Sequence, residues 1–544
     1  MISKYIDILS ALFAVDGVAF LIVGVAFLIV GVTGIYLFVK VLSRSPGLKW
    51  TPKQFNIACV GAAMVLGGAA FSGAYVAVFL GAYILGKNDS GKILARWVQV
   101  VPAKEGGCFA SDEGEIKECL TEFSVRAVLD SSLKCADVSF KHAGSNEISM
   151  LERSYPGLNG YMGFKTIRVC EKRISINQDQ GDIKFNDNKQ IGISRWWGTE
   201  QSNDPGRIIV LGDTGCRNML DRETQEIVAC ASKEWPFKII SNKAAGEELN
   251  LVLHVGDYMY VDIDSWSAWQ TAFFKPAKQL LMAAPWVMVR GNHEGCGNFG
   301  QTPHGFFLFF GLGDVETCKK NDDLRDSYAL DLPKNHLLIV ADSSKAFEPN
   351  VQKALDPTSE NNGNLGSIGD MVAGLGRLAS AKRETIWLTT HVPVFALEHC
   401  EVKKGDIAGN MKDGATKCIK STTDLFKADS PESSAHMFAA WQNASVEGID
   451  AIISGDRHVF QIVQSTGNPL QITVGTGGVN LDLAPLTKKE NFNCLSKDNI
   501  ELPDENMVSE TLKSWEHCSN KQWGYATAKR NGENYKFTFK PINF

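Results

Sequence analysis

The chain has no excess of basic residues. Lysine and arginine together number 55 against 61 aspartates and glutamates, so the formal net charge is −6. No basic stripe interleaved with aromatic residues stands out along the 544 residues either. Domains that bind nucleic acid usually concentrate positive charge in this way. We therefore expect no nucleic-acid partner.

Charged residues are absent from two long apolar stretches near the N-terminus, residues 17–39 and 57–86. Each exceeds the roughly 20 residues that cross a bilayer as a helix. Two such stretches so close together favour membrane spans over buried core helices, and we predict a transmembrane hairpin over residues 1–87. A cleaved signal peptide is the weaker alternative, because the first apolar run is too long for one.

Acidic residues are absent from the segment between these two stretches. Residues 40–53 carry four basic residues instead, Lys40, Arg44, Lys49 and Lys53. Short loops rich in lysine and arginine stay on the cytoplasmic side of a membrane. The N-terminus and everything after residue 87 are then expected to be extracytoplasmic, in a periplasm, in a lumen or outside the cell.

The motif C-x-x-C is absent as well, which weakens an interpretation of the 13 cysteines as metal-binding thiols. Cys59 lies within the second predicted membrane helix, which leaves 12 for the rest of the chain. An even number of cysteines in an extracytoplasmic domain fits a set of disulfide bonds. Spacing leaves their connectivity open, but four neighbouring pairs are plausible: Cys216/Cys230, Cys296/Cys318, Cys400/Cys418 and Cys494/Cys518.

The character of the sequence changes near residue 206. Residues 88–205 are polar and turn-rich, with short alternating runs such as FSVRAVLD and KTIRVC, and they predict a small β-rich lead-in module. From residue 207, apolar β-branched runs alternate with stretches long enough for helices, such as 227–248 and 264–283. This alternation predicts an α/β domain, which we place over residues 206–544.

The apolar runs of this domain end in polar residues of similar chemistry. GDTG, GDYMY, GNHE, TTHVPV and GDRH follow five of them. In α/β domains, functional groups gather beyond the carboxyl ends of the strands. Carboxylate, imidazole, amide and phenol groups are donors for hard and borderline metal ions. The candidate ligands are Asp213, Asp257, Tyr260, Asn292, His391, Asp456 and His458.

This series resembles the calcineurin-like metallophosphoesterase superfamily, whose blocks run D-x-H or D-x-G, GDxxD/Y, GNHE/D, a lone His and GHxH. Gly215 in GDTG and Tyr260 in GDYMY are similar to the purple acid phosphatase branch, as are HVPVFALEH and the order of GDRHVFQ and ITVGTGG. GDTGC with Arg217, and WPF at 235–237, are similar to exported bacterial members. The resemblance covers about residues 205–490 and implies a four-layer α/β/β/α sandwich.

The resemblance also implies two adjacent metal ions bridged by Asp257. One ion, expected to be Fe(III), would take Asp213, Tyr260 and His458. The other, a divalent ion such as Mn, Fe, Zn or Mg, would take Asn292, His391 and the first residue of the last block. That residue is Asp456, where the family has histidine. A carboxylate is a harder donor than imidazole and should tilt the second site towards Mn, Mg or Fe(II).

The reaction implied by the resemblance is hydrolysis of phosphate monoesters by attack of a metal-bound hydroxide. His293 and His399 are candidates to orient the phosphate or protonate the leaving oxygen, and Glu294 to support them. Two alternatives stay open: a pseudo-enzyme or binding protein on a degenerate scaffold, because of Asp456, and a phosphodiesterase of the same superfamily. The natural substrate and the oligomeric state also stay open, because the loops between the motifs match no known pattern.

Overall fold

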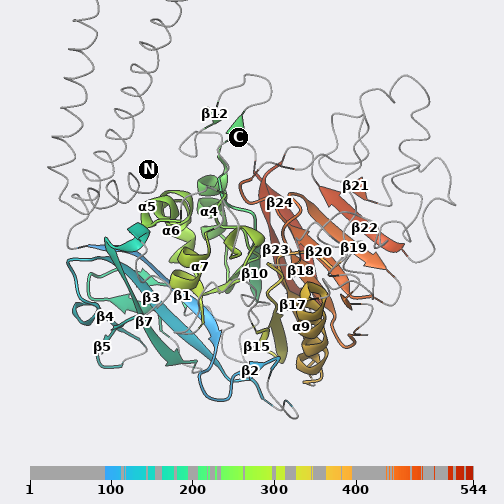
Figure 1. Ribbon diagram of the computed structural model, residues 1–544, viewed down its shortest axis with the longest axis horizontal. Coiled ribbons are helices and arrows are strands. Elements are labelled where there is room, and N and C mark those ends of the chain that lie inside the picture. The colour runs from blue at the N-terminus through green and yellow to red at the C-terminus, as the bar shows by residue number, and fades with distance from the viewer. Residues whose placement is uncertain are drawn as a thin grey trace, which may run out of the picture. The chain divides into compact units, whose positions relative to one another are not determined.

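The computed structural model (Figure 1) describes part of the chain, and the predicted transmembrane hairpin, Cys59 and His399 lie outside that part. No helix within it is both long and apolar enough to cross a membrane. The described residues are 92–111, 116, 118–142, 145–153, 162–176, 181–193, 206–216, 219–220, 227–228, 235–260, 264–296, 302–312, 326–344, 346, 363–381, 383–394, 437, 440–441, 444, 446–465, 468–479, 481, 495–496, 512–518, 522–531 and 534–542.

The first of two large sheets has nine strands in the order β24-β23-β10-β13-β14-β1-β3-β7-β6. Its parallel centre runs from β10 through β13 and β14 to β1, and antiparallel strands extend it on both sides. In that order the strands are Asn534–Pro541, Gly524–Asn531, Arg207–Leu211, Leu251–His254, Trp286–Met288, Ile93–Pro102, Thr121–Asp130, Ile167–Ser175 and Leu151–Glu152.

The second sheet also has nine strands, in the order β2-β15-β16-β17-β18-β20-β19-β22-β21. Strands β16, β17, β18 and β20 are parallel, and the remaining pairs are antiparallel. In that order the strands are Cys108–Phe109, Tyr328–Leu332, His336–Val340, Thr385–Thr389, Ala451–Ser454, Leu470–Val474, Phe460–Ser465, Leu512–Cys518 and Leu495–Ser496.

Shorter elements complete the described fold. One small sheet has the order β5-β4-β8-β9 (Ile148–Ser149, Ser139–Lys141, Ile183–Phe185, Gln190–Ile191), and β11 pairs with β12 (Met219–Leu220, Ile227–Val228). The helices are α4 (Phe237–Ala245), α5 (Trp266–Trp269), the π-helix η4 (Gln270–Phe274), α6 (Lys275–Leu281), α7 (Pro303–Phe310) and α9 (Gly363–Ala379). The single-turn 3₁₀ helices are η1 (Cys135–Asp137), η3 (Met162–Phe164) and η5 (Asn292–Glu294).

Three hydrophobic cores define the order of the layers. The central core joins the facing sides of the two sheets, with Val125 and Leu253 from the first and Leu338 from the second. A second core packs helices α4 to α7 on the outer face of the first sheet, and a third packs α9 on the outer face of the second (Figure 1). Central strands are apolar on both faces because both faces are buried. This arrangement agrees with the predicted α/β/β/α layers.

The segment predicted as a lead-in module is rich in strands, and its long strands lie within the large sheets. Strand β1 pairs with β14 on one side and β3 on the other, and β2 pairs with β15 of the second sheet. Residues 91–544 form one compact unit for this reason. The burial of β1 from Arg96 onwards fits its place inside a sheet covered on both faces.

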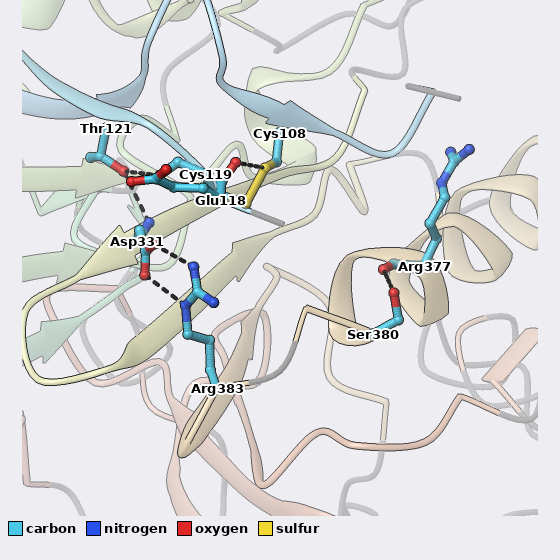
Figure 2. The surroundings of a disulfide bond; sticks show 8 residues. All are labelled: Cys108, Glu118, Cys119, Thr121, Asp331, Arg377, Ser380 and Arg383. Atoms are coloured by element: carbon cyan, nitrogen blue, oxygen red, sulfur yellow. Dashed lines mark hydrogen bonds and ion pairs between the residues drawn. A yellow bond between two sulfur atoms is a disulfide. The ribbon is translucent and has the colours of Figure 1, made fainter. Parts of the chain in front are cut away.

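Disulfide bonds are present, as predicted, although the two described pairs are not among the four suggested by spacing. Cys108 is bonded to Cys119, and Cys135 to Cys170. Figure 2 shows the first bond beside the ion pair of Asp331 and Arg383. Cys216 and Cys296 are disulfide-bonded as well.

Candidate metal centre

All seven predicted ligands lie at the carboxyl ends of parallel strands and converge on one site. Two strands of the first sheet, β10 and β13, lead into Asp213, Asp257 and Tyr260, and β14 leads into Asn292. From the second sheet, β17 leads into His391, and β18 leads into Asp456 and His458. The two sheets therefore each supply part of the site, which lies where their strand ends meet.

Three of the ligands form one half of the site. Oη of Tyr260 lies 3.0 Å from Oδ1 of Asp213 and 3.2 Å from Nε2 of His458. Nε2 of His458 lies 3.6 Å from the same Asp213 oxygen. These residues are the set that the family resemblance assigns to one ion.

The other half is centred on Nε2 of His391. This atom lies 2.9 Å from the terminal amide of Asn292, 3.3 Å from Oδ1 of Asp257 and 3.8 Å from Oδ1 of Asp456. The Asn292 amide is also 3.2 Å from both carboxylate oxygens of Asp257. Donor atoms of Asp213, Asp257 and His391 all lie within 4.8 Å of one another, which joins the two halves.

The donor chemistry of the site fits bound cations. Burial raises the pKa of the Asp213 carboxyl well above its ordinary value, and His391 lowers it less than burial raises it. The neighbouring carboxylates of Asp257 and Asp456 raise the Asp213 pKa further. Packing buried acidic groups together is unfavourable unless a cation compensates their charge. The arrangement is therefore suited to metal ions and poorly suited to a purely structural role.

The protonation of His391 is also appropriate for a ligand. Its Nδ1 lies 2.7 Å from the carbonyl oxygen of Val255, and because a carbonyl only accepts, Nδ1 carries the proton in this bond. Nε2 lies on the side of Asn292, Asp257 and Asp456, and it is the nitrogen that would offer a lone pair to a metal ion. A hydrogen bond of this kind orients the ring of a metal-binding histidine.

Three of the six described non-glycine residues with a positive φ angle are aspartates of the site. Asp213, Asp257 and Asp456 have φ angles of 55°, 58° and 65°, in the left-handed region. Such conformations cost on the order of 1 kcal/mol each and are retained mainly where they serve a function. Gly256, at φ 101°, has no room for a side chain, because a Cβ would lie 2.5 Å from Nδ1 of His391.

The departure at Gly215 from the histidine of most superfamily members has a steric counterpart. A Cβ at this position would lie 2.5 Å from Cδ2 of Tyr260 and 2.9 Å from the backbone of Met259. A side chain at 215 would therefore clash with both the Tyr260 ring and the Met259 backbone. The two branch-specific residues noted in the sequence form one packing arrangement.

Two of the residues predicted to act in catalysis differ in their surroundings. The His293 ring is partly exposed and packs 4.3 Å from the ring of Tyr260, measured between centroids. Glu294 is fully buried, and its carboxylate accepts backbone N–H groups of Asp257, Tyr258, Met259 and Gly291 at 3.0–3.2 Å. It therefore braces the ligand-bearing turns and does not face the site opening.

A family model described as calcineurin-like phosphoesterase matches residues 206–460, the stretch that holds all seven predicted ligands. Residues 206–460 therefore carry a calcineurin-like phosphoesterase domain. This family implies a dinuclear metal centre, and the cluster of Asp213, Asp257 and His391 is the candidate position for it.

Similar solved structures include a purple acid phosphatase from yellow lupin (Lupinus luteus) seeds, with 12% identity, a TM-score of 0.44, and coverage of 82% of this chain and 71% of that chain. PhoD has 11% identity and a TM-score of 0.43, covering 82% and 88% respectively. A dimetal phosphatase from Danio rerio has 10% identity and a TM-score of 0.35, covering 62% and 97%. No curated protein matches the sequence.

Two residues hold the segments that bear predicted ligands and were not themselves predicted from the sequence. Oγ of Ser343 accepts the backbone N–H groups of His391 and Val392, at 3.1 and 2.8 Å. His254, the last residue of β13, hydrogen bonds both aspartate turns of the first sheet. Ser343 follows a buried strand and His254 ends one, as the predicted ligands do. Their position at the end of an apolar run is the sequence feature that could have indicated a role at the site. Neither carries a recognisable motif.

Proposed function

We propose that this protein is a membrane-anchored, extracytoplasmic phosphoesterase that hydrolyses phosphate monoesters at a dinuclear metal centre of the purple acid phosphatase type. The observation that carries the proposal is the convergence of the Asn292 amide and two carboxylates, those of Asp257 and Asp456, on Nε2 of His391. Tyr260 and His458 extend this donor set on the Asp213 side.

The residues divide into two sets of ligands that share Asp257. Asp213, Tyr260 and His458 would hold an Fe(III) ion, while Asn292, His391 and Asp456 would hold a divalent ion. Two such ions neutralise phosphoryl oxygens and lower the pKa of a coordinated water. The chain itself fixes the ligand positions, through the carbonyl of Val255 at His391 and the Glu294 carboxylate behind Asp257.

His293 is the residue best placed to contact a substrate. It is partly exposed, lies directly beside the ligand Tyr260 and follows the ligand Asn292. Its backbone N–H donates to Oδ1 of Asp257 at 3.0 Å, which fixes the start of its side chain. We assign it to binding the phosphate or protonating the leaving oxygen. His399 is assigned the same kind of role from the sequence resemblance alone.

The test combines metal analysis with two substrates. The purified protein should contain close to two metal ions per chain and should hydrolyse p-nitrophenyl phosphate faster than bis-p-nitrophenyl phosphate. Faster cleavage of the diester would indicate a phosphodiesterase. Less than one metal ion per chain together with no turnover would favour a binding protein on a phosphoesterase scaffold, the alternative motivated by Asp456.

The membrane anchor and its orientation rest on separate support. The apolar stretches at 17–39 and 57–86 support a hairpin, and the basic residues between them support a cytoplasmic loop. The disulfides Cys108–Cys119 and Cys135–Cys170 support an oxidising compartment for the large domain. A reporter fused after Phe544 should be active only outside the cytoplasm. Activity confined to the cytoplasm would overturn the orientation.

A further inference from the structure

The two aspartate turns of the first sheet are neighbours joined by backbone hydrogen bonds. The N–H of Asp213 donates to the carbonyl of Gly256 at 2.9 Å, and the N–H of Thr214 donates to the carbonyl of Asp257 at 3.0 Å. Both aspartates have positive φ angles, so each turn holds a strained conformation. The separation of the two carboxylates depends on how firmly these turns are held together.

His254 makes one hydrogen bond to each turn from the strand side. The backbone N–H of Gly256 lies 3.2 Å from its Nδ1, and Oγ1 of Thr214 lies 2.8 Å from its Nε2. A backbone N–H only donates, so Nδ1 must be the unprotonated nitrogen. Nε2 then carries the proton and donates it to the Thr214 hydroxyl. A neutral imidazole with this one tautomer satisfies both turns at once.

The ring of His254 is itself fixed in place. It is fully buried, and it stacks on Tyr258 with 3.9 Å between ring centroids and 15° between planes. Oη of Tyr258 donates to the carbonyl of Val289, the residue after β14, at 3.0 Å. The imidazole therefore cannot shift without disturbing the neighbouring strand, and it can serve as a rigid spacer between the turns.

We propose that His254 is a positioning residue that sets the separation of Asp213 and Asp257 and thereby the affinity of the site for metal ions. This inference rests on the proposed dinuclear centre, because it gives the two aspartates their roles as ligands. His254 contacts neither carboxylate, so its effect is exerted through the backbone of the two turns. Outer partners of metal ligands typically change metal affinity by about 10- to 100-fold.

Three substitutions in the purified full-length protein distinguish the packing of the His254 ring from its two hydrogen bonds. His254→Phe keeps the aromatic volume and removes both hydrogen bonds. His254→Asn places an oxygen near the Nδ1 position and keeps the acceptor for Gly256. His254→Gln places an amide nitrogen near the Nε2 position and keeps the donor to Thr214. Metal-free samples of each are titrated with Mn²⁺ by calorimetry, and hydrogen–deuterium exchange is followed over residues 208–216 and 251–260.

His336 supplies a matched control. It is also fully buried in a β-strand, its ring lies 4.4 Å from that of Trp387, and its Nδ1 is 3.3 Å from Oη of Tyr535. It begins β16, at the opposite end of the strand from Ser343 and the candidate metal centre. His336→Phe should destabilise the protein without affecting the two aspartate turns.

We expect His254→Phe to weaken Mn²⁺ binding by at least about tenfold and to speed exchange in both turns, with His254→Asn and His254→Gln in between. His336→Phe should leave affinity and exchange in these turns unchanged. Wild-type affinity in His254→Phe, or equal weakening in His336→Phe, would overturn the inference. If the wild-type protein itself binds no metal ion, the proposed function is wrong. In that case, hydrogen–deuterium exchange in the metal-free variants tests the role of His254 by itself. Unchanged exchange in His254→Phe would show that the histidine does not hold the turns.

Discussion

Oδ1 of Asp456 lies 3.8 Å from Nε2 of His391, and the backbone N–H of Asp456 donates to Oδ2 of Asp213 at 3.2 Å. The side chain of Asp456 is only 7% exposed. The stretch SGDRHVF therefore places its aspartate inside the candidate metal site and not on a surface turn. This is the position at which the resemblance implies histidine, so the chain offers a carboxylate where relatives offer imidazole.

Removing the Asp456 carboxylate should weaken the second metal ion. Asp456→Asn keeps the size of the side chain and suits the positive φ angle, so it isolates the loss of charge. We expect turnover to fall by at least about tenfold, which corresponds to about 1.4 kcal/mol of transition-state stabilisation. Asp456→His should keep or raise activity and shift preference towards Zn²⁺. The measurements are metal content and p-nitrophenyl phosphate kinetics.

A particular pair of results would contradict this assignment. If Asp456→Asn leaves metal content and rate unchanged while His458→Ala destroys both, Asp456 is not a ligand. The second site would then be built differently or be missing.

Asp257 should be required for both metal ions. It is the ligand common to the two halves, and its carboxylate is buried beside His391. Asp257→Ala should release both ions and abolish activity, with metal content measured on the purified variant. Asp331→Asn is the control, because Asp331 is a partly buried aspartate paired with Arg383 away from the site. Two retained ions in Asp257→Ala would disprove a bridged pair.

The visible absorption spectrum should show whether Tyr260 coordinates a metal ion. Burial raises the pKa of its phenol well above the ordinary value, and Asp213 and Asp257 raise it further. The phenol is therefore protonated unless a cation displaces the proton. If the ion is Fe(III), the protein should be coloured by phenolate coordination, and Tyr260→Phe or a chelator should remove the colour. Colour that survives Tyr260→Phe would exclude this tyrosine as the ligand.

The ligand positions were predictable because one physical rule governs them. Parallel buried strands are recognisable in a sequence as apolar runs, and their carboxyl ends meet at one edge of the sheet. Asp213, Asp257 and His391 each follow such a run, so they could be predicted to lie together from the sequence. The incorporation of β1 and β3 into the first sheet was not predictable. It depends on the pairing of Gln99 with Trp286, nearly two hundred residues apart, and local sequence patterns carry no information on such pairings.

The same limit applies to the cluster of buried arginines behind α7. Guanidinium groups bind the C-terminal end of the helix, because Arg126 and Arg153 donate to the carbonyl of Gly311, its C-cap residue, at 2.8 and 2.7 Å. Glu171 accepts from both, at 3.2 and 2.7 Å. Cations stabilise a helix C-terminus, and α7 follows the GNHE segment. The cluster thus ties strands β3, β6 and β7 to the helix next to the metal site.

Neutralising Glu171 should destabilise the protein strongly at neutral pH. Although burial raises the pKa of Glu171, Arg126 and Arg153 outweigh burial and lower it below the ordinary value of 4.5. The ionised form thus contributes stability above pH 4.5, and this contribution declines as the pH falls below that value. Glu171→Gln should cost about 3–5 kcal/mol at pH 7, since it removes the carboxylate that compensates the charge of the buried arginines. Urea unfolding at several pH values should show a smaller loss for the variant at pH 3.

The two described disulfides should differ in how much they stabilise the protein. Cys135–Cys170 closes a chain separation of 35 residues and Cys108–Cys119 one of 11. Loop-closure entropy predicts about 3.8 and about 2.8 kcal/mol respectively. Replacing both cysteines of a pair with serine avoids a free thiol, and urea unfolding without reductant should show a loss larger by about 1 kcal/mol for the 135/170 pair. A reductant should destabilise the wild-type protein at least as much as either double substitution. If reductant and both double substitutions leave stability unchanged, the cysteines are not bonded in the native protein, and the argument for an oxidising compartment loses its structural support.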